Sequence, residues 1–402
     1  MTSSRSNTIL VVSFLILVQA TGALAGFWLP AIATEIAEDL DLNASLITYP
    51  VLLLYICAMI SSLFAGGLVS RFGAWRSSQL ALMCMGISHF MFMEGSLLLI
   101  ALGSSVLGGA YGLVTPAASH LLAKVVTSKN RNLIFSIRFT GVPIGGSLAG
   151  LIGPPTALNF GWQQSMAITI IIAVLLCIVM QPFRDRWDED RCASSTILRN
   201  PTSDLKLVWS LIPLRWLALS GLCMGAIQTT LTTFTVNMLV EDLDYTLIAA
   251  GIGLSTVQFS SIFGRVAWGW LADRLNSGLL ALMCISLIAA MCAFATTLLS
   301  SSWSHLFVYS LCFVFGLVGM GWNGVYASEI ARLSPKDDVS KTTGASFFIT
   351  FSGVFLGPVL FTSAYSVTQA YNTTFVVTTV IALLAYIFID KAKRTLVKAG
   401  KN

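Results

Sequence analysis

The sequence predicts an all-α membrane protein with twelve transmembrane helices in two six-helix bundles. The chain of 402 residues is 56% hydrophobic and only 10% charged, whereas soluble globular proteins carry roughly 25% charged residues. Apolar runs of about 20 residues, the length that spans hydrocarbon, recur along the whole chain. A transmembrane β-barrel would instead require segments of about 10 residues that alternate apolar and polar side chains, and the sequence lacks that alternation.

The apolar runs, their Pro and Gly punctuation and the charged breaks between them define the predicted spans. These spans lie near residues 8–34, 46–70, 77–94, 96–123, 132–157, 162–183, 213–240, 245–272, 277–299, 303–331, 341–366 and 371–390. The longest polar stretch, residues 184–206, separates the sixth span from the seventh. We therefore predict an N-terminal six-helix bundle (1–183), a cytoplasmic central loop (184–212) and a C-terminal six-helix bundle (213–402).

The charged residues give the orientation of this map. All but two of the 23 Lys and Arg residues lie at the termini, in the central loop, or in loops after spans 2, 4, 8 and 10. In a twelve-span chain these segments share one side, and the positive-inside rule makes that side cytoplasmic. The opposite loops contain no Lys or Arg, only acids: Glu35, Glu38, Asp39, Asp41, Glu94, Glu241, Asp242 and Asp244. We expect a multi-pass protein of the bacterial inner (plasma) membrane with both termini in the cytoplasm.

The two halves contain weak internal repeats. GGAYGLVTP from Gly108 parallels GMGWNGVYA from Gly319, and RFTGVPIGG from Arg138 parallels TFSGVFLGP from Thr350. Two related six-helix halves are typical of secondary transporters, whose substrate site lies at mid-membrane between the repeats. The repeat therefore favours a transporter.

The loops after spans 2 and 8 carry the most specific repeat, GGLVSRFGAWR and GWLADRLN. They resemble two copies of the loop motif G-x-L-x-D-R-x-G of the major facilitator superfamily. The matching positions are Gly66, Leu68, Ser70, Arg71 and Gly73, and Gly269, Leu271, Asp273 and Arg274. The resemblance covers essentially the whole chain and implies the major facilitator fold, two pseudo-symmetric six-helix bundles that act as a secondary transporter.

Within that superfamily, GRVAWGWLADR is similar to span 8 of the oxalate–formate and monocarboxylate porters. RFTGVPIGGSLAG and GWNGVYASEIARLSP are similar to segments of bacterial organic-anion and cyanate-type porters. In the first group, an arginine four residues before the motif glycine binds the substrate carboxylate. That arginine corresponds to Arg265 here.

The first motif copy departs from the family pattern, because Ser70 occupies the position of the acid that the second copy keeps as Asp273. The resemblance implies that this acid braces a cytoplasmic gate by pairing with arginine and with the N-terminus of a helix in the opposite half. A helix dipole favours an acid there, whereas a serine could only cap the helix. Gate bracing is therefore expected mainly from Asp273, Arg274 and Glu329. The alternative is that all three are ordinary flanking charges.

Arg265 lies eight residues before Asp273, or ~12 Å along a helix, in a hydrocarbon layer whose half-thickness is about 15 Å. A lipid-facing arginine near the centre costs at least ~2.5 kcal/mol. Gln258 and Arg265 belong to one polar stripe of their helix, and such a stripe faces protein or water. We predict that Arg265 contacts an anionic substrate. Structural pairing with backbone carbonyls or Glu329 is the alternative.

Arg138 is the other basic residue outside the loops. It lies only ~9 Å from the Asn132 end of its span, so it either faces the substrate cavity or snorkels to the surface. Isolated Ser and Thr residues more often mediate helix packing than ligand contact. The further candidates for the substrate site are therefore mainly larger polar side chains at mid-depth: Gln19, Tyr111, Gln228, Trp322, Asn323, Tyr326 and Thr350.

The spans contain two deep cations and no deep acid, which disfavours a cationic substrate. A guanidinium offers a carboxylate two parallel N–H donors. Import of one negative charge costs ~2.3 kcal/mol per 100 mV, so uptake needs a co-transported proton or an exchanged anion. The predicted function is secondary active transport of a small organic anion, a carboxylate, by alternating access, as proton-coupled symport or anion exchange (antiport). The alternative is efflux of an uncharged or amphipathic compound, with Arg265 structural.

Other functional classes lack support in the sequence. No catalytic constellation, phosphate loop or nucleophile elbow occurs, and none of the eight cysteines forms a CxxC or Cys/His cluster. We expect no enzyme activity, no cofactor and no metal. The net charge of +5 is cytoplasmic flanking charge, so no nucleic-acid partner is expected. The expected partners are the anionic substrate, protons or a counter-anion, and the lipid bilayer around a monomer.

Overall fold

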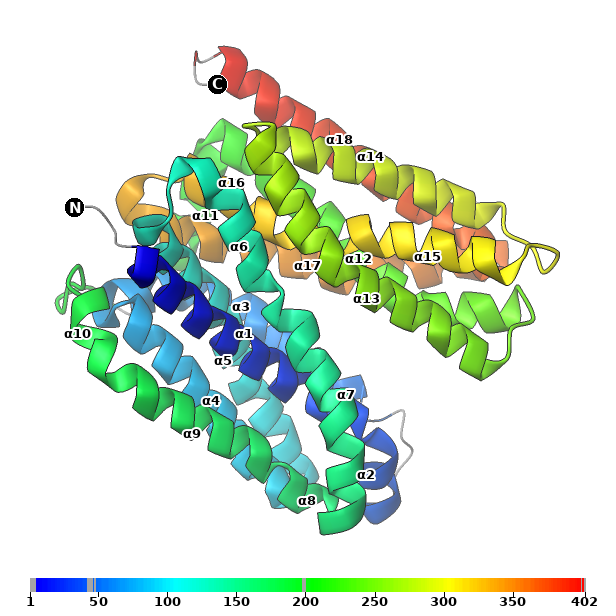
Figure 1. The fold of residues 1–402 in the computed structure, drawn as a ribbon, viewed down its shortest axis with the longest axis horizontal. Coiled ribbons are helices and arrows are strands. Elements are labelled where there is room, and N and C mark those ends of the chain that lie inside the picture. Colours follow the sequence, from blue (N-terminus) through cyan, green and yellow to red (C-terminus); the bar gives the residue numbers. More distant parts are fainter. Residues whose placement is uncertain (1–4, 42–45, 47, 197–199, 399, 401–402) are drawn as a thin grey trace. The chain divides into compact units, whose positions relative to one another are not determined.

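The computed structural model describes residues 5–41, 46, 48–196, 200–398 and 400, and these residues contain helices and no strands (Figure 1). In hydrocarbon every backbone polar group must be hydrogen-bonded within the protein, and an α-helix achieves this within a single segment. The first helices are α1 (Arg5–Ala31), α2 (Ala33–Asp39), α3 (Thr48–Phe72), α4 (Ala74–Met93), α5 (Leu97–Val125), α6 (Arg131–Phe139), α7 (Gly141–Phe160), α8 (Trp162–Ser165), α9 (Ala167–Met180) and α10 (Arg184–Trp187). They are followed by α11 (Pro201–Ser210), α12 (Ile212–Glu241), α13 (Leu247–Arg274), α14 (Gly278–Thr297), α15 (His305–Gly319), α16 (Asn323–Leu333), α17 (Val339–Thr368) and α18 (Tyr371–Lys398).

Among the described residues, eleven helical segments are long and apolar enough to cross a membrane. The predicted third span corresponds to α4, a 20-residue helix that is not one of the eleven. Its first two turns carry Arg76, Ser77, Ser78 and Gln79, which lower its mean hydropathy. The prediction of an all-α membrane protein is confirmed.

Two predicted spans are broken well inside the span, whereas the breaks at Ile32 and Met166 lie near the ends of the spans predicted at 8–34 and 162–183. The span predicted at 132–157 consists of α6 and α7, with Thr140 between them. The span predicted at 303–331 consists of α15 and α16, separated by residues 320–322. Discontinuous helices in transporters mark the depth of the substrate site. Arg138 lies just before the first break, and Trp322 lies in the second.

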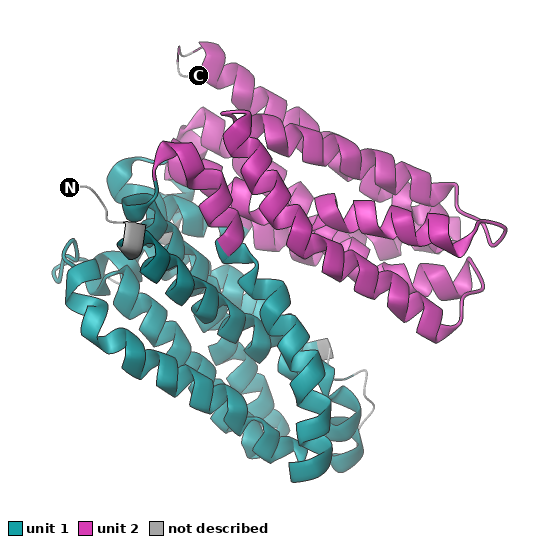
Figure 2. Ribbon diagram, viewed as in Figure 1, with its two compact units in different colours: residues 1–126, 138–206, 334–348 teal, residues 127–137, 207–333, 349–402 magenta. Residues whose placement is uncertain are grey.

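The chain forms two compact units, shown in different colours in Figure 2. Unit 1 contains residues 1–126, 138–206 and 334–348, and unit 2 contains residues 127–137, 207–333 and 349–402. A short segment of each half of the sequence therefore packs with the other half. Residues 127–137 begin α6 and belong to unit 2, while residues 334–348 begin α17 and belong to unit 1.

Glycines allow equivalent helix pairs to approach closely in the two units. In unit 1, α3 packs on α5, and a Cβ on Gly108 would collide with the Leu54 carbonyl. In unit 2, α13 packs on α15, and a Cβ on Gly316 would collide with the Val257 carbonyl. Small residues at such contacts are typical of membrane helices. The same pair is thus built in the same way in both units.

Candidate functional site

Arg138 and Arg265 are both buried, each with 1% of its surface exposed. Arg138 belongs to unit 1 and Arg265 to unit 2. A buried guanidinium is costly unless its N–H groups find acceptors. The hydrogen-bond partners of each arginine therefore indicate whether its role is structural or whether donors remain for a ligand.

Arg138 is held mainly by α5. Its Nη1 donates a hydrogen bond to Thr115 Oγ1 (3.3 Å), and its Nη2 donates to the Val114 carbonyl (3.4 Å). Its guanidinium carbon lies 4.5 Å from the centre of the Phe139 ring, within cation–π range. Its Nε has no hydrogen-bond partner among the described residues. One buried donor of Arg138 is therefore available to a ligand.

Two further predicted site residues lie close to Arg138 in unit 1. Tyr111 precedes Thr115 by one turn on α5. A Cβ on Gly22 of α1 would lie 3.7 Å from the Tyr111 ring, and one on Gly141 would lie 3.0 Å from the Gln19 Cβ. Gln19 is 3% exposed, and within the described structure its Oε1 accepts no hydrogen bond. Tyr111 therefore lies one turn from Thr115, which binds Arg138, and Gln19 packs against Gly141, three residues after Arg138.

Sequence reasoning missed Tyr55 of α3. Its ring packs edge-on against Tyr111, with 6.4 Å between the ring centres. Its span holds two tyrosines, Tyr49 at the start and Tyr55 well inside, and the deeper position of Tyr55 was the available signal.

Five predicted residues form a second cluster, in unit 2. The Tyr326 hydroxyl and Thr350 Oγ1 are hydrogen-bonded at 3.0 Å. Asn323 Nδ2 donates to Gln228 Oε1 (3.4 Å), and the Trp322 and Tyr326 ring centres are 5.2 Å apart. Residues from α12, α16 and α17 are thus gathered around the break between α15 and α16.

Arg265 lies on α13 beside the same break. Its neighbour Gly264 packs against the Leu317 carbonyl, and a Cβ on Gly321 would lie 3.0 Å from the Gly264 carbonyl carbon. Gln258, predicted on the same stripe, is half-buried two turns earlier, and its carbonyl accepts a hydrogen bond from Ser261 Oγ (2.7 Å). The close glycine contacts fix the depth of Arg265 relative to Trp322.

Asp273 of the second loop motif binds the beginning of α6. Its carboxylate accepts hydrogen bonds from the Asn132 amide (3.0 Å), the Leu133 amide (2.8 Å) and Asn132 Nδ2 (2.9 Å). The first amides of a helix have no partner within the helix, and its dipole favours a negative charge there. Asp273 therefore occupies the kind of position that the resemblance implies.

The other two expected bracing residues have different partners. Arg274 is exposed, and its guanidinium carbon lies 4.9 Å from the Trp270 ring centre. Glu329 is 2% exposed and forms an ion pair with Arg332 at 2.7 Å. Glu329 also packs against Gly278, where a Cβ would lie 2.5 Å from its Oε1. Of the three, Asp273 is the residue for which the structure records bonds to α6.

At the first glycine of each motif copy, another helix approaches the backbone closely. A Cβ on Gly66 would lie 2.8 Å from the Lys341 Cα, within unit 1. A Cβ on Gly269 would lie 2.5 Å from Ser136 Oγ, within unit 2. Both positions require glycine because the neighbouring atoms leave no room for a side chain.

The end of the first motif copy is held by an acid from the central loop. Gly73 has φ 93°, and a Cβ there would collide with the Asp188 carboxyl. That carboxylate accepts hydrogen bonds from the amides of Trp75 (2.8 Å) and Arg76 (3.0 Å) and caps α4. Burial raises the pKa of Asp188 above its usual value, against the opposing effect of these bonds. Sequence reasoning missed Asp188, which is one of several acids in the loop.

The remaining motif residues contact the same loop. The Ser70 carbonyl accepts a hydrogen bond from the Cys192 amide (2.8 Å), and Arg71 Nη1 donates to the Ser195 carbonyl (3.3 Å). No group of three His, Cys, Asp or Glu residues that could hold a metal ion occurs in the described ranges.

The sequence matches the Major Facilitator Superfamily over residues 13–358. The chain is 26% identical over 293 residues to multidrug resistance protein 2 of Bacillus subtilis, with 69% of each chain covered. It is 22% identical over 317 residues to a probable hexose phosphate transport protein of Chlamydia pneumoniae, with 70% of this chain and 69% of the relative covered. Its fold is similar to that of the E. coli fucose:proton symporter FucP, with a TM-score of 0.77, 14% identity and coverage of 97% and 99%.

Proposed function

The chain belongs to the major facilitator superfamily, and we propose that it transports a small organic anion across the bacterial inner membrane by alternating access. The observation that carries this proposal is the pair of buried guanidinium groups, Arg138 and Arg265, each 1% exposed. A carboxylate is the substrate group that suits them best, because a guanidinium fork donates two parallel hydrogen bonds to it.

The surroundings of Arg138 support a ligand contact. Its hydrogen bonds to Thr115 and to the Val114 carbonyl, at 3.3 and 3.4 Å, are long compared with about 2.7–2.9 Å for a charged pair. Its Nε and the nearby Gln19 Oε1 have no hydrogen-bond partner in the described part of the chain. A substrate carboxylate would accept from Arg138, while a protonated group on the substrate would donate to Gln19.

In unit 2, the cluster of Gln228, Trp322, Asn323, Tyr326 and Thr350 supplies neutral donors and acceptors. These groups suit the hydroxyl, carbonyl or amide part of a substrate, while Arg265 suits its charge. We propose Gln258, half-buried on the stripe of Arg265, as a further polar contact.

Coupling follows from the charge of the substrate. Import of one negative charge against an inside-negative potential costs ~2.3 kcal/mol per 100 mV. We propose that a co-transported proton or an exchanged anion offsets this cost. The proposal also includes two six-helix halves divided at the central loop, both termini in the cytoplasm, gating by both loop motifs, and a monomeric carrier without enzymatic activity.

A second candidate function is efflux of an uncharged or amphipathic compound, with Arg265 purely structural. The similarity to multidrug resistance protein 2 supports it, whereas the similarity to a probable hexose phosphate transport protein supports an anionic substrate. The two candidates differ in whether flux depends on the charge of the substrate.

The test is uptake by the purified chain in proteoliposomes of radiolabelled acetate, oxalate and succinate, each with a pH gradient, an internal counter-anion or neither. We expect saturable uptake of at least one carboxylate that rises with the gradient or the counter-anion. Absence of carboxylate flux, together with transport of an amphipathic neutral dye, would support the efflux carrier instead.

A further inference from the structure

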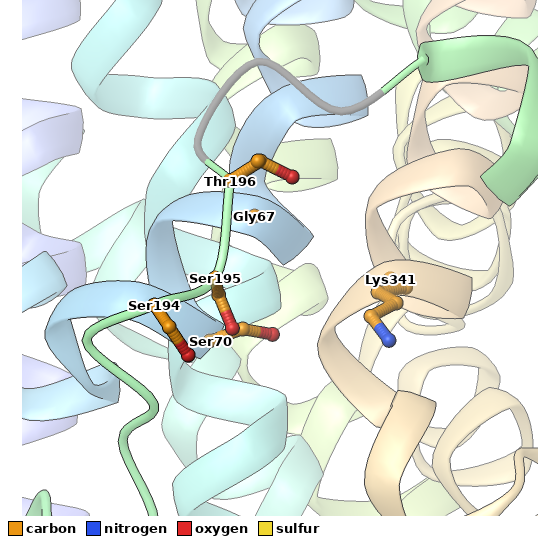
Figure 3. Close-up of a pocket in the computed structure, with 6 residues that line it drawn as sticks. All are labelled: Gly67, Ser70, Ser194, Ser195, Thr196 and Lys341. Carbon is orange, nitrogen blue, oxygen red and sulfur yellow. The ribbon is translucent and has the colours of Figure 1, made fainter.

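A hollow of about 380 Å³ lies at the end of α3 in unit 1 (Figure 3). It is lined by Gly67, Ser70, Ser194, Ser195, Thr196 and Lys341. Gly67 and Ser70 lie in the last two turns of α3, Ser194, Ser195 and Thr196 come from the central loop, and Lys341 lies in the first turn of α17. None of the residues proposed above to contact substrate lines it.

The lining has the chemistry of an anion site. Side-chain hydroxyls come from α3 and the loop, a lysine comes from α17, and no carboxylate belongs to the lining. In Figure 3 the Ser70 and Thr196 hydroxyls point toward the helix that carries Lys341. Hydroxyls donate hydrogen bonds to oxyanions, and an ammonium adds charge and three donors.

The backbone around the hollow is held in place. The Cys192 amide donates to the Ser70 carbonyl (2.8 Å), and Arg71 donates to the Ser195 carbonyl (3.3 Å). On the other side, Gly66 lets the Lys341 backbone approach, since a Cβ there would lie 2.8 Å from the Lys341 Cα. The hydroxyls and the lysine are thus presented from anchored segments, which lowers the entropy cost of binding.

The second motif copy shows what the first one lacks. By the repeat, Ser70 is equivalent to Asp273, whose carboxylate accepts three hydrogen bonds from α6. The Ser70 side chain brings no charge, and open volume adjoins it where the second copy carries its own anion.

We propose that this pocket binds a phosphate group, as free phosphate or as a phosphomonoester, which replaces the missing motif acid. Ser70, Ser195 and Thr196 would donate to its oxygens, and Lys341 would offset part of its negative charge. Lys341 Nζ also contacts Asp338 Oδ1 at 2.5 Å, and its other N–H donors remain for the phosphate. A bound phosphate would join the end of α3, the central loop and the start of α17 within unit 1. The inference is independent of which substrate is transported.

The first test is the melting temperature of the full-length chain in neutral detergent while inorganic phosphate is titrated. A ligand that binds only the folded state raises stability with the logarithm of its concentration once it exceeds Kd. We expect such a rise with phosphate and none with chloride at equal ionic strength. An identical response to both salts would overturn the proposal.

Two variants test whether the stabilisation by phosphate arises at this pocket. Lys341→Gln should weaken the apparent phosphate affinity about tenfold or more because it removes the only charge in the lining. Lys336→Gln, an exposed lysine outside the lining, is the matched control and should respond as wild type does. Ser70→Asp places a carboxylate in the pocket, so it should abolish the phosphate response. Retention of the full response in both Lys341→Gln and Ser70→Asp would show an adventitious ion only.

The source of the phosphate is tested in nanodiscs of phosphatidylcholine with and without phosphatidic acid. A Lys341-dependent response to inorganic phosphate in pure phosphatidylcholine identifies a free phosphate ligand. A Lys341-dependent stabilisation by phosphatidic acid alone identifies a lipid headgroup, and neither response would contradict the proposal. Arg265→Lys should keep the phosphate response, so failure of the transport proposal and failure of this one are distinguishable.

Discussion

The two copies of the loop motif show how one sequence pattern is completed in two ways. In the second copy, Asp273 itself binds the beginning of α6. In the first copy, Ser70 supplies no charge, and Asp188 from the central loop caps α4 just beyond the motif. The second copy is therefore complete in itself, whereas the first depends on the central loop. The central loop is thus a structural part of the first copy, and the following changes test that comparison.

The largest effect is expected for Gly73→Ala. The substitution places a side chain at φ 93°, in collision with the Asp188 carboxyl. Strain of this kind costs about 1–3 kcal/mol, and displacement of the α4 cap adds about 1 kcal/mol. The melting temperature in detergent should fall by several degrees. Gly150→Ala is the control, since nothing lies within 4 Å of its added Cβ. An equal effect of both substitutions would contradict the account.

Asp273→Ala should lower the free energy of unfolding by about 1–3 kcal/mol, because the amides of Asn132 and Leu133 lose their acceptor. The equivalent change in the first copy, Ser70→Ala, should stay within about 0.5 kcal/mol, measured without phosphate. Equal losses of unfolding free energy in the two variants, measured by thermal or denaturant unfolding, would contradict the comparison.

Asp188→Ala should cost about 1 kcal/mol, with an upper limit near 2 kcal/mol, the range for loss of a helix N-cap. Asp185→Ala is the matched control, because Asp185 is exposed and its ion pairs lie at the surface. Surface pairs contribute about 0–1 kcal/mol. If removing Asp188 is no more harmful than removing Asp185, the first copy does not depend on the loop in the way described.

The smallest effect concerns Asp190, which ties the central loop to α5. A hydrogen bond from His120 (2.7 Å), with help from Lys124, holds the pKa of Asp190 well below its usual range. An acid with a depressed pKa adds stability that is present above its unfolded pKa, about 3.9, and is lost as pH falls below it. Asp190→Asn should therefore lower the melting temperature slightly at neutral pH. The difference should shrink as pH falls below about 4, and a difference that grew instead would contradict this.

Much of the fold could be predicted from the sequence because hydropathy and charge report directly on membrane spans. The helix breaks at Thr140 and at residues 320–322 could not, since their positions depend on contacts with neighbouring helices. The third span was predicted from its apolar run, although α4 is weakly apolar, and the distribution of Lys and Arg agreed with the resulting twelve-span map.

The candidate site was predictable where depth alone singles out a residue. Arg138 and Arg265 stood out as charges within apolar runs, and both are buried. The pairing of Gln228 with Asn323 was not predictable, because it joins α12 to α16 across a long stretch of sequence. Asp188 was missed for the same reason. Asp188 caps α4 from the distant central loop, so no local sequence pattern around α4 identifies it.

The central claim is that buried guanidinium groups bind the anionic part of the substrate. Arg265→Lys tests it most directly, because the change keeps the charge but removes the planar fork. In proteoliposomes with matched amounts of inserted protein, carboxylate uptake should fall about tenfold or more. Arg394→Lys, at an exposed position on α18, should transport as wild type does. Unimpaired carboxylate uptake by Arg265→Lys would contradict the claim.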